Sequence, residues 1–220
     1  MRAGQAALWY PIVGALLGTL LALTAWLLAT APAGLSALLV LLLWIWGTGA
    51  LHLDGLADCA DAWVGGLGDR ERTWQILKDP HTGTMGSVAL LALLLTKWVS
   101  IETLLSGDSV ALVWLISLPA LARAQVLLLV LTTPAAQTQG LGATLRQTIP
   151  RPAAWMIYGL SWLLAGWFWG IVALEVWLLL LALWWLWRRT LLARLGGLNG
   201  DGAGALIELS EAAGLVMIAL

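Results

Sequence analysis

Long apolar segments dominate this chain of 220 residues. A helix needs about 20 apolar residues to cross a bilayer, and lipid admits only helices or closed barrels, because every backbone polar group must be satisfied internally. The segments are continuous rather than alternating, which favours helices. They cover residues 7–30, 34–51, 87–106, 109–132, 153–169, 171–187 and 203–220. The sequence therefore predicts an all-α, polytopic transmembrane bundle of seven spans, or six if residues 153–187 form one bent helix and a short one.

The composition excludes several classes of protein. Only 10% of the residues are charged and 61% are hydrophobic, whereas a soluble domain has about 25% charged residues. A soluble enzyme or a disordered chain is therefore excluded. The net charge of −1 lacks the basic footprint of a nucleic-acid binder, so the expected surroundings are a lipid bilayer and no nucleic acid. We expect residues 1–220 to form a single integral membrane catalytic domain; the sequence leaves its oligomeric state open.

The basic residues indicate how the spans are oriented. Nine of the eleven Lys and Arg lie at Arg2 or in the loops 52–86, 133–152 and 188–202, while the intervening loops carry none. Cytoplasmic loops of membrane proteins are enriched in Lys and Arg. The alternation therefore predicts a cytoplasmic N-terminus with these three loops on the same side.

Acidic residues gather after the second apolar segment, where six of the twelve lie between positions 54 and 79. On a helix, Asp54, Asp58 and Asp61 share one stripe. Three carboxylates there repel each other unless a cation lies among them, and hard oxygen ligands suit Mg²⁺ or Mn²⁺. The stripe predicts a metal site, with a solvated helix end as the alternative.

Two irregular stretches follow the stripe. Gly65 and Gly66 begin a turn whose backbone N–H groups could face an anion, although a plain turn has the same composition. Asp69 is expected to cap a short helix over residues 70–78.

On that helix, Trp74 and Leu77 are expected to face lipid, and Arg70 is expected to face water or substrate. Asp79 and His81 lie in the second stretch, where His81 could bind phosphate or be a bystander.

The last apolar segment opens with a second acidic cluster. Glu208 and Glu211 lie on one helix face, and Asp201 lies roughly above them. Carboxylates within a span are costly without a partner, which predicts a functional or metal role or else a structural polar pair. Lys97 and Arg123 lie in the middle of spans, and each needs a carboxylate or a ligand phosphate as its partner.

Three segments carry a resemblance to a known family. They read HLDGLADCADAWVGG at 52–66, DRERTWQILKDPHTGTMG at 69–86 and LGGLNGDGAGALIELSEAAGL at 195–215. This pattern resembles the cobalamin synthase family, the adenosylcobinamide-GDP ribazoletransferases. In relatives a Gly often stands at the position of Ala62 and an Arg at that of His81. They also carry a polar lead before the segment matching Trp9-Tyr10-Pro11, so we expect a shortened or misassigned start here.

The resemblance implies a reaction and a set of site residues. Adenosylcobinamide-GDP would donate its adenosylcobinamide phosphate to α-ribazole or α-ribazole 5′-phosphate, giving adenosylcobalamin or its 5′-phosphate and GMP, with Mg²⁺ as cofactor, at the bacterial inner membrane. The expected catalytic residues are Asp54, Asp58, Asp61, Asp69, Glu208 and Glu211, of which Asp54, Asp58 and Asp61 would hold the metal. The expected substrate-binding residues are His52, Gly65, Gly66, Arg70, Asp79, His81, Lys97, Arg123 and Asp201.

Two other functions compete with this interpretation. CDP-alcohol phosphotransferases also use spaced aspartates at a membrane face, and Asp58 with Asp61 supplies the first part of their pattern. However, Thr73 occupies the position of their final Asp. A transporter could use Lys97 and Arg123 along a path, but it should also contain two related halves, and we find no such repeat.

Overall fold

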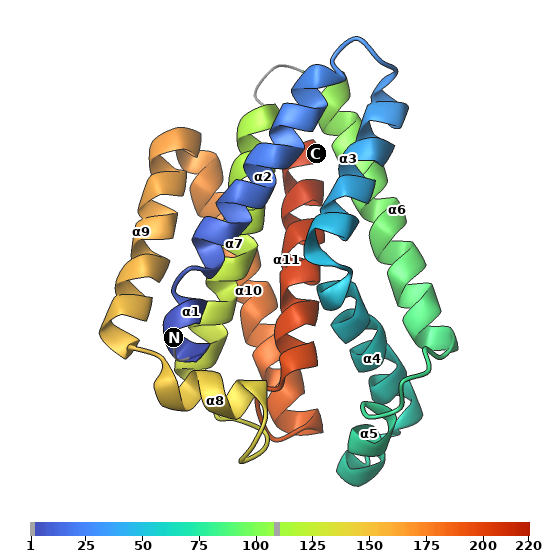
Figure 1. The fold of residues 1–220 in the computed structure, drawn as a ribbon, viewed down its shortest axis with the longest axis vertical. Coiled ribbons are helices and arrows are strands. Elements are labelled where there is room, and N and C mark those ends of the chain that lie inside the picture. Colours follow the sequence, from blue (N-terminus) through green and yellow to red (C-terminus); the bar gives the residue numbers. More distant parts are fainter. Residues whose placement is uncertain (1–2, 108–110) are drawn as a thin grey trace.

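The computed structural model describes residues 3–107 and 111–220, and in these the chain forms helices and no strand. Arg2 and the first residues of the segment 109–132 lie outside this range. The helices run up and down an elongated bundle (Figure 1). They are α1 (Ala3–Ala7), α2 (Tyr10–Leu27), α3 (Ala33–Thr48), α4 (Leu51–Gly65), α5 (Arg70–Ile76), α6 (Thr84–Ser106), α7 (Ala111–Thr132), α8 (Leu141–Thr148), α9 (Arg151–Trp169), α10 (Ile171–Arg194) and α11 (Gly200–Ala219).

Each of the seven apolar segments contains a helix, which confirms the all-α bundle. By length and composition, five helices among the described residues could cross a membrane, namely α2, α6, α7, α10 and α11. Together α3 and α4 add a sixth, with an 87° bend between them. The 19-residue α9 is not in this set. The structure therefore supports five or six crossings, whereas the sequence predicts seven or six.

The bend between α3 and α4 is built from two left-handed residues, Gly49 (φ 61°) and Ala50 (φ 56°). Gly49 and Ala50 donate their N–H groups to the carbonyls of Trp46 and Ile45, which closes α3. Helix α4 begins at the next residue. A left-handed conformation strains an L-residue such as Ala50, and here it turns the acidic helix α4 sharply away from the axis of α3.

Arginines join several helices at the end of the bundle that carries α5 and α8 (Figure 1). The last carbonyls of a helix have no partner within it. Arg146, Arg151 and Arg188 donate to carbonyls of residues 130–133, at and just beyond the end of α7, over 2.8–3.2 Å. Arg194 donates in the same way to the carbonyl of Trp63 in α4 (3.1 Å). The basic loops predicted to share one side thus meet at one end.

The short helix α5 packs against the protein rather than against lipid. Leu77 is buried in the main apolar cluster, and Trp74 packs against the same cluster. The expectation that both face lipid was therefore wrong. Trp74 and Leu77 do share the apolar face of this segment, but that face meets the protein interior.

Residues 153–187 form two helices joined by one glycine, and not one bent helix. Gly170 connects α9 to α10 with φ 58° and ψ −129°, and the two helices then run side by side in opposite directions (Figure 1). This conformation is essentially restricted to glycine.

We expect Gly170→Ala to destabilise the protein by about 1–3 kcal/mol, because an L-residue is strained in this conformation. A Cβ at Gly170 would meet no atom within 4 Å, so crowding does not contribute. Thermal unfolding in detergent measures the change. Gly166→Ala is the matched control, since its Cβ also meets nothing within 4 Å and its φ is not positive. Equal unfolding temperatures for the two variants would contradict the role of the backbone.

Candidate active site

The site is built where α4 and α11 approach each other closely. A Cβ on Gly55 would lie 2.8 Å from the carbonyl oxygen of Asp201, and one on Gly204 would lie 3.2 Å from the Cα of His52. Glycine at both positions lets the two backbones come this near. As a result, the first turns of the two helices place Asp54 beside Asp201.

The first turn of α11 is held by its cap and by α10. The Asn199 side chain accepts the N–H of Gly202 (2.9 Å) and donates to Asp201 Oδ2 (2.8 Å). Trp187 of α10 donates its indole N–H to the carbonyl of Gly202 (2.7 Å) and stacks on Trp63 of α4, with ring centroids 5.7 Å apart. Helix α10 therefore fixes α4 and α11 together.

Asp54, Asp58 and Asp201 form a group of like charges, because Asp54 and Asp58 are one turn apart on α4 and the backbone of Asp201 lies against Gly55 of the same helix. Asp54 is exposed, and Asp58 and Asp201 are half-buried. Among the described residues, no Lys or Arg nitrogen lies within 4.0 Å of these three carboxylates. Their repulsion is thus uncompensated within that part of the chain.

This group offers hard oxygen ligands, although no three His, Cys, Asp or Glu side chains in residues 3–107 and 111–220 are close enough together to hold a metal as they stand. Mg²⁺ usually keeps several waters and binds through one or two carboxylates and the phosphates of a substrate. It therefore does not need a preformed cage, and the donor set of Asp54, Asp58 and Asp201 fits it. The assignment of the metal ligands stays a prediction.

Asp61, the third member of the predicted stripe, uses both of its carboxylate oxygens within the protein. Gly83 and Gly86 donate their backbone N–H groups to Oδ2 (2.6 Å) and Oδ1 (2.9 Å), respectively. The carboxylate also lies where a Cβ on either glycine would clash. Asp61 therefore ties α4 to the start of α6, and its predicted role as a metal ligand remains untested.

The Gly-rich turn and α5 follow the sequence pattern in part. The side chain of Asp69 accepts the N–H groups of Glu71 and Arg72 (2.8 and 3.1 Å), which confirms the predicted cap. Helix α5 ends at Ile76, two residues earlier than expected. A Cβ on Gly65 or Gly66 would collide with side chains of α5, so these glycines allow close packing of that helix.

The remaining predicted loop residues are exposed. His81 Nδ1 lies 2.7 Å from Asp79 Oδ1, and this hydrogen bond lowers the pKa of the Asp79 carboxyl below its usual value. Arg70 Nη2 lies 3.5 Å from the carbonyl oxygen of Leu192. All three lie on or just after α5.

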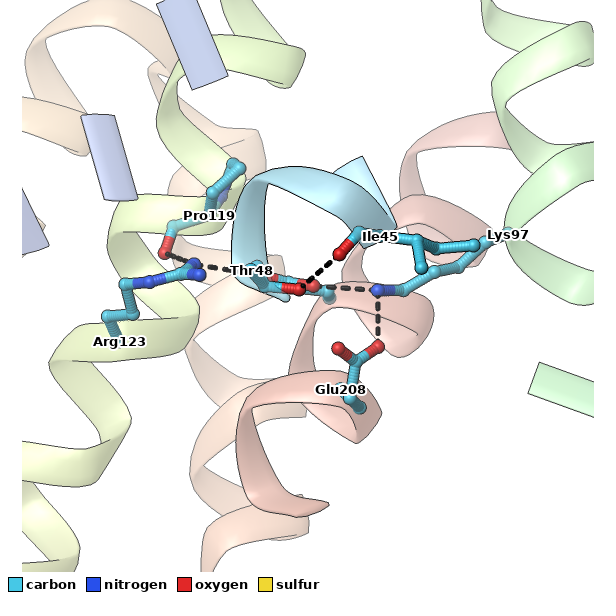
Figure 2. Close-up of polar contacts among 7 residues, drawn as sticks. Ile45, Thr48, Lys97, Pro119, Arg123 and Glu208 are labelled. Atoms are coloured by element: carbon cyan, nitrogen blue, oxygen red, sulfur yellow. Dashed lines mark hydrogen bonds and ion pairs between the residues drawn. The ribbon is translucent and has the colours of Figure 1, made fainter. Parts of the chain in front are cut away.

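The mid-span charges of α6, α7 and α11 pair with one another. Of the two partners expected for Lys97 and Arg123, a carboxylate or a ligand phosphate, the structure shows carboxylates. Lys97 Nζ lies 2.6 Å from both Glu208 Oε2 and Glu211 Oε2, and Arg123 Nη1 lies 2.9 Å from Glu211 Oε1. Arg123 Nη1 also donates to the carbonyl of Pro119 (3.0 Å). Figure 2 shows Lys97 of α6 and Arg123 of α7 pointing toward each other from opposite sides. All four charged side chains are buried, and their formal charges cancel.

A cavity of about 580 Å³ lies beside this network and the aspartate group. Its polar lining includes His52, Asp54, Arg123 and Asp201. Nδ1 of His52 is buried and has no hydrogen-bond partner among the described residues. The cavity thus unites four predicted substrate-binding or catalytic residues from α4, α7 and α11.

Sequence reasoning missed two kinds of residue at this site. One is the apolar lining from α2 and α8, such as Val13 and Leu145, which nothing in the sequence distinguishes from lipid-facing residues. The other is the support around α11. Asn199 directly before a helical segment is a recognisable cap signal, whereas the contact of Trp187 with Gly202 has no local signature.

We expect Lys97→Met to destabilise the protein by about 3–5 kcal/mol, because it leaves a buried negative charge without its partner. Thermal unfolding in detergent measures this loss. Lys97→Met combined with Glu208→Met keeps the buried charge balanced and should recover much of the stability. Lys78→Met, at an exposed lysine, is the control. A Lys97→Met protein as stable as this control would contradict the pairing.

Comparison with known proteins identifies the family of the chain. The family model described as cobalamin-5-phosphate synthase matches residues 1–219. A protein of Pseudomonas entomophila (strain L48) named adenosylcobinamide-GDP ribazoletransferase is 48% identical over 227 residues, which covers 99% of this chain and 88% of that protein. Proteins of the same name are 49% identical in Pseudomonas aeruginosa PAO1 (99% of this chain, 87% of the relative) and 43% identical in Acinetobacter baumannii (94% and 83%). No solved structure matches the chain. The chain therefore belongs to the cobalamin-5-phosphate synthase family.

Proposed function

We propose that this chain is an adenosylcobinamide-GDP ribazoletransferase that depends on Mg²⁺. It transfers the adenosylcobinamide phosphate group from adenosylcobinamide-GDP to α-ribazole or α-ribazole 5′-phosphate. The products are adenosylcobalamin or its 5′-phosphate and GMP. Membership of the family and the names of the relatives support this activity.

The observation that carries the proposal is the uncompensated aspartate group of Asp54, Asp58 and Asp201 beside the cavity. A diphosphate substrate is strongly anionic, so carboxylates at its binding site require a cation between them and the phosphates. Asp54, Asp58 and Asp201 would hold Mg²⁺, which when bound shields the charge of the diphosphate and of the leaving GMP.

The transfer is a displacement at phosphorus. The 3′-hydroxyl oxygen of the ribazole forms a bond to the phosphorus attached to cobinamide, while the bond from that phosphorus to the bridging oxygen breaks. GMP leaves with the electron pair, and the hydroxyl proton passes to a carboxylate. Glu208 and Glu211 are tied to Lys97 and Asp61 to backbone N–H groups, so a carboxylate of the aspartate group that is not bound to the cation is the better-placed base.

We place the protein in the bacterial inner membrane, with the end that carries α5 and α8 toward the cytoplasm. The basic loops lie at this end, and such loops are retained on the cytoplasmic side. The aspartate group belongs to the same end, where anionic substrates dissolved in the cytoplasm would reach it.

Asp58→Asn should lower the rate of cobalamin formation by about 10²-fold or more, because it removes a charge from the cation site without changing the size of the side chain. Purified protein or membranes supplied with adenosylcobinamide-GDP, α-ribazole 5′-phosphate and Mg²⁺ provide the assay, and released GMP is measured. Glu175→Gln, at an exposed acid in the first part of α10, is the control. Undiminished GMP release by Asp58→Asn would overturn the assignment.

Removing divalent cations with EDTA should abolish turnover, and added Mg²⁺ should restore it, since nothing else in the described part of the chain offsets the aspartate group. The same assay follows this change. Full turnover in the presence of EDTA would show that the transfer proceeds without a divalent cation.

A further inference from the structure

The lining of the 580 Å³ cavity combines two kinds of side chain. Apolar side chains come from α2, α7 and α8, including Val13, Leu17, Val126 and Leu145. Carboxylates come from Asp54 of α4 and Asp201 of α11. A ligand that fills it must therefore combine a flat or bulky apolar part with a part that bears hydroxyl groups.

The size of the cavity discriminates between the two substrates of the proposed reaction. Pockets of about 300–1,000 Å³ hold molecules of the size of a drug, and a nucleoside such as α-ribazole is of that size. Adenosylcobinamide-GDP carries a corrin ring, an adenosyl group and a guanosine diphosphate, and it greatly exceeds this volume. Only the smaller substrate can enter completely.

We propose that this cavity is the binding site of the acceptor nucleoside, with its apolar base against Val13, Leu17 and Val126 and its ribose toward Asp54 and Asp201. The assignment rests on the proposed function. It makes the lining from α2 the surface that selects the base, while the carboxylates face the hydroxyl groups.

A second, smaller cavity gives the donor a separate approach. It measures about 220 Å³, lies beside α5 and the loop before α8, and is lined in part by Lys78, Gln137 and Gln139. Leu141, Gly200 and Asp201 line both cavities. Asp201 therefore lies at the boundary between them, where a ribose hydroxyl from the larger cavity can meet a phosphate that arrives from the smaller one.

Arg123 at the larger cavity adds a contact suited to the acceptor. Its guanidinium is buried, and the contacts to Glu211 and Pro119 use only Nη1, although a guanidinium has five N–H donors. The remaining donors or the face of the guanidinium can meet an aromatic base or a 5′-phosphate. This contact is compatible with both α-ribazole and its phosphate as the acceptor.

The test narrows the cavity from its apolar side. Val13 lines the cavity and is 53% exposed, so Val13→Trp fills space without disturbing the core. Val88→Trp is the matched control, because Val88 of α6 is 51% exposed and does not line the cavity. The KM values of the full chain for α-ribazole and for adenosylcobinamide-GDP are measured, and also the kcat/KM for benzimidazole riboside, which lacks the two methyl groups of the α-ribazole base.

We expect Val13→Trp to raise the KM for α-ribazole by about tenfold or more and to leave the KM for adenosylcobinamide-GDP unchanged. It should also shift the kcat/KM ratio toward the smaller riboside by about tenfold or more, because a single extra carbon in an apolar pocket already gives about tenfold discrimination. A variant that is merely damaged would not change its preference for the base.

If both variants show the same kinetics as the wild type, or if only the KM for adenosylcobinamide-GDP rises, the acceptor assignment is overturned while the proposed function stands. If the wild-type chain forms no cobalamin from either acceptor, the proposed function itself fails. The wild-type assay therefore separates the two outcomes.

Discussion

Lys97 places a positive charge inside an apolar bundle, and two glutamates of α11 lie within 2.6 Å of its ammonium group. Arg123 of α7 completes the set through Glu211. A single charge in such surroundings would be very unfavourable, whereas four that cancel and share hydrogen bonds are tolerated. Since the four residues come from three helices, their pairing fixes how deeply α6, α7 and α11 sit relative to one another. The register of α11 then determines which of its residues face α4.

The site depends on this register and on glycine. The charge network fixes the position of α11 along the axis of the bundle. Gly55 and Gly204 then let α4 approach α11 until the two backbones are in contact. The left-handed residue Ala50 turns α4 into this position. The carboxylates of Asp54, Asp58 and Asp201, to which we assign the cation, therefore repel one another but are held together by contacts outside their own group. In the proposed reaction, a bound cation would offset this repulsion.

Much of the fold could be predicted because local physical signals specify it. The length of helix needed to cross a bilayer identified each apolar segment, and an Asp at position 69 predicted the start of α5, which it caps in the structure. The motif residues gave the family. The partners of Lys97 could not be predicted, because a buried ammonium can donate equally well to a carboxylate or to a phosphate. Only the packing of helices far apart in the sequence brings Glu208 next to it. The apolar residues that line the cavity could not be predicted for a related reason. In the sequence, an apolar residue such as Val13 that faces a cavity cannot be distinguished from one that faces lipid.

The charge network also has a consequence for biosynthesis. Both acids of the network lie in α11, the last 20-residue helix of the chain, while the two bases lie in α6 and α7. During synthesis the bases therefore enter the membrane before α11. Until α11 is made, Lys97 and Arg123 lack the carboxylates that pair with them in the folded protein, and a charge within a span is costly without a partner. A variant that lacks α11 should therefore be much less stable in the bilayer than the full chain.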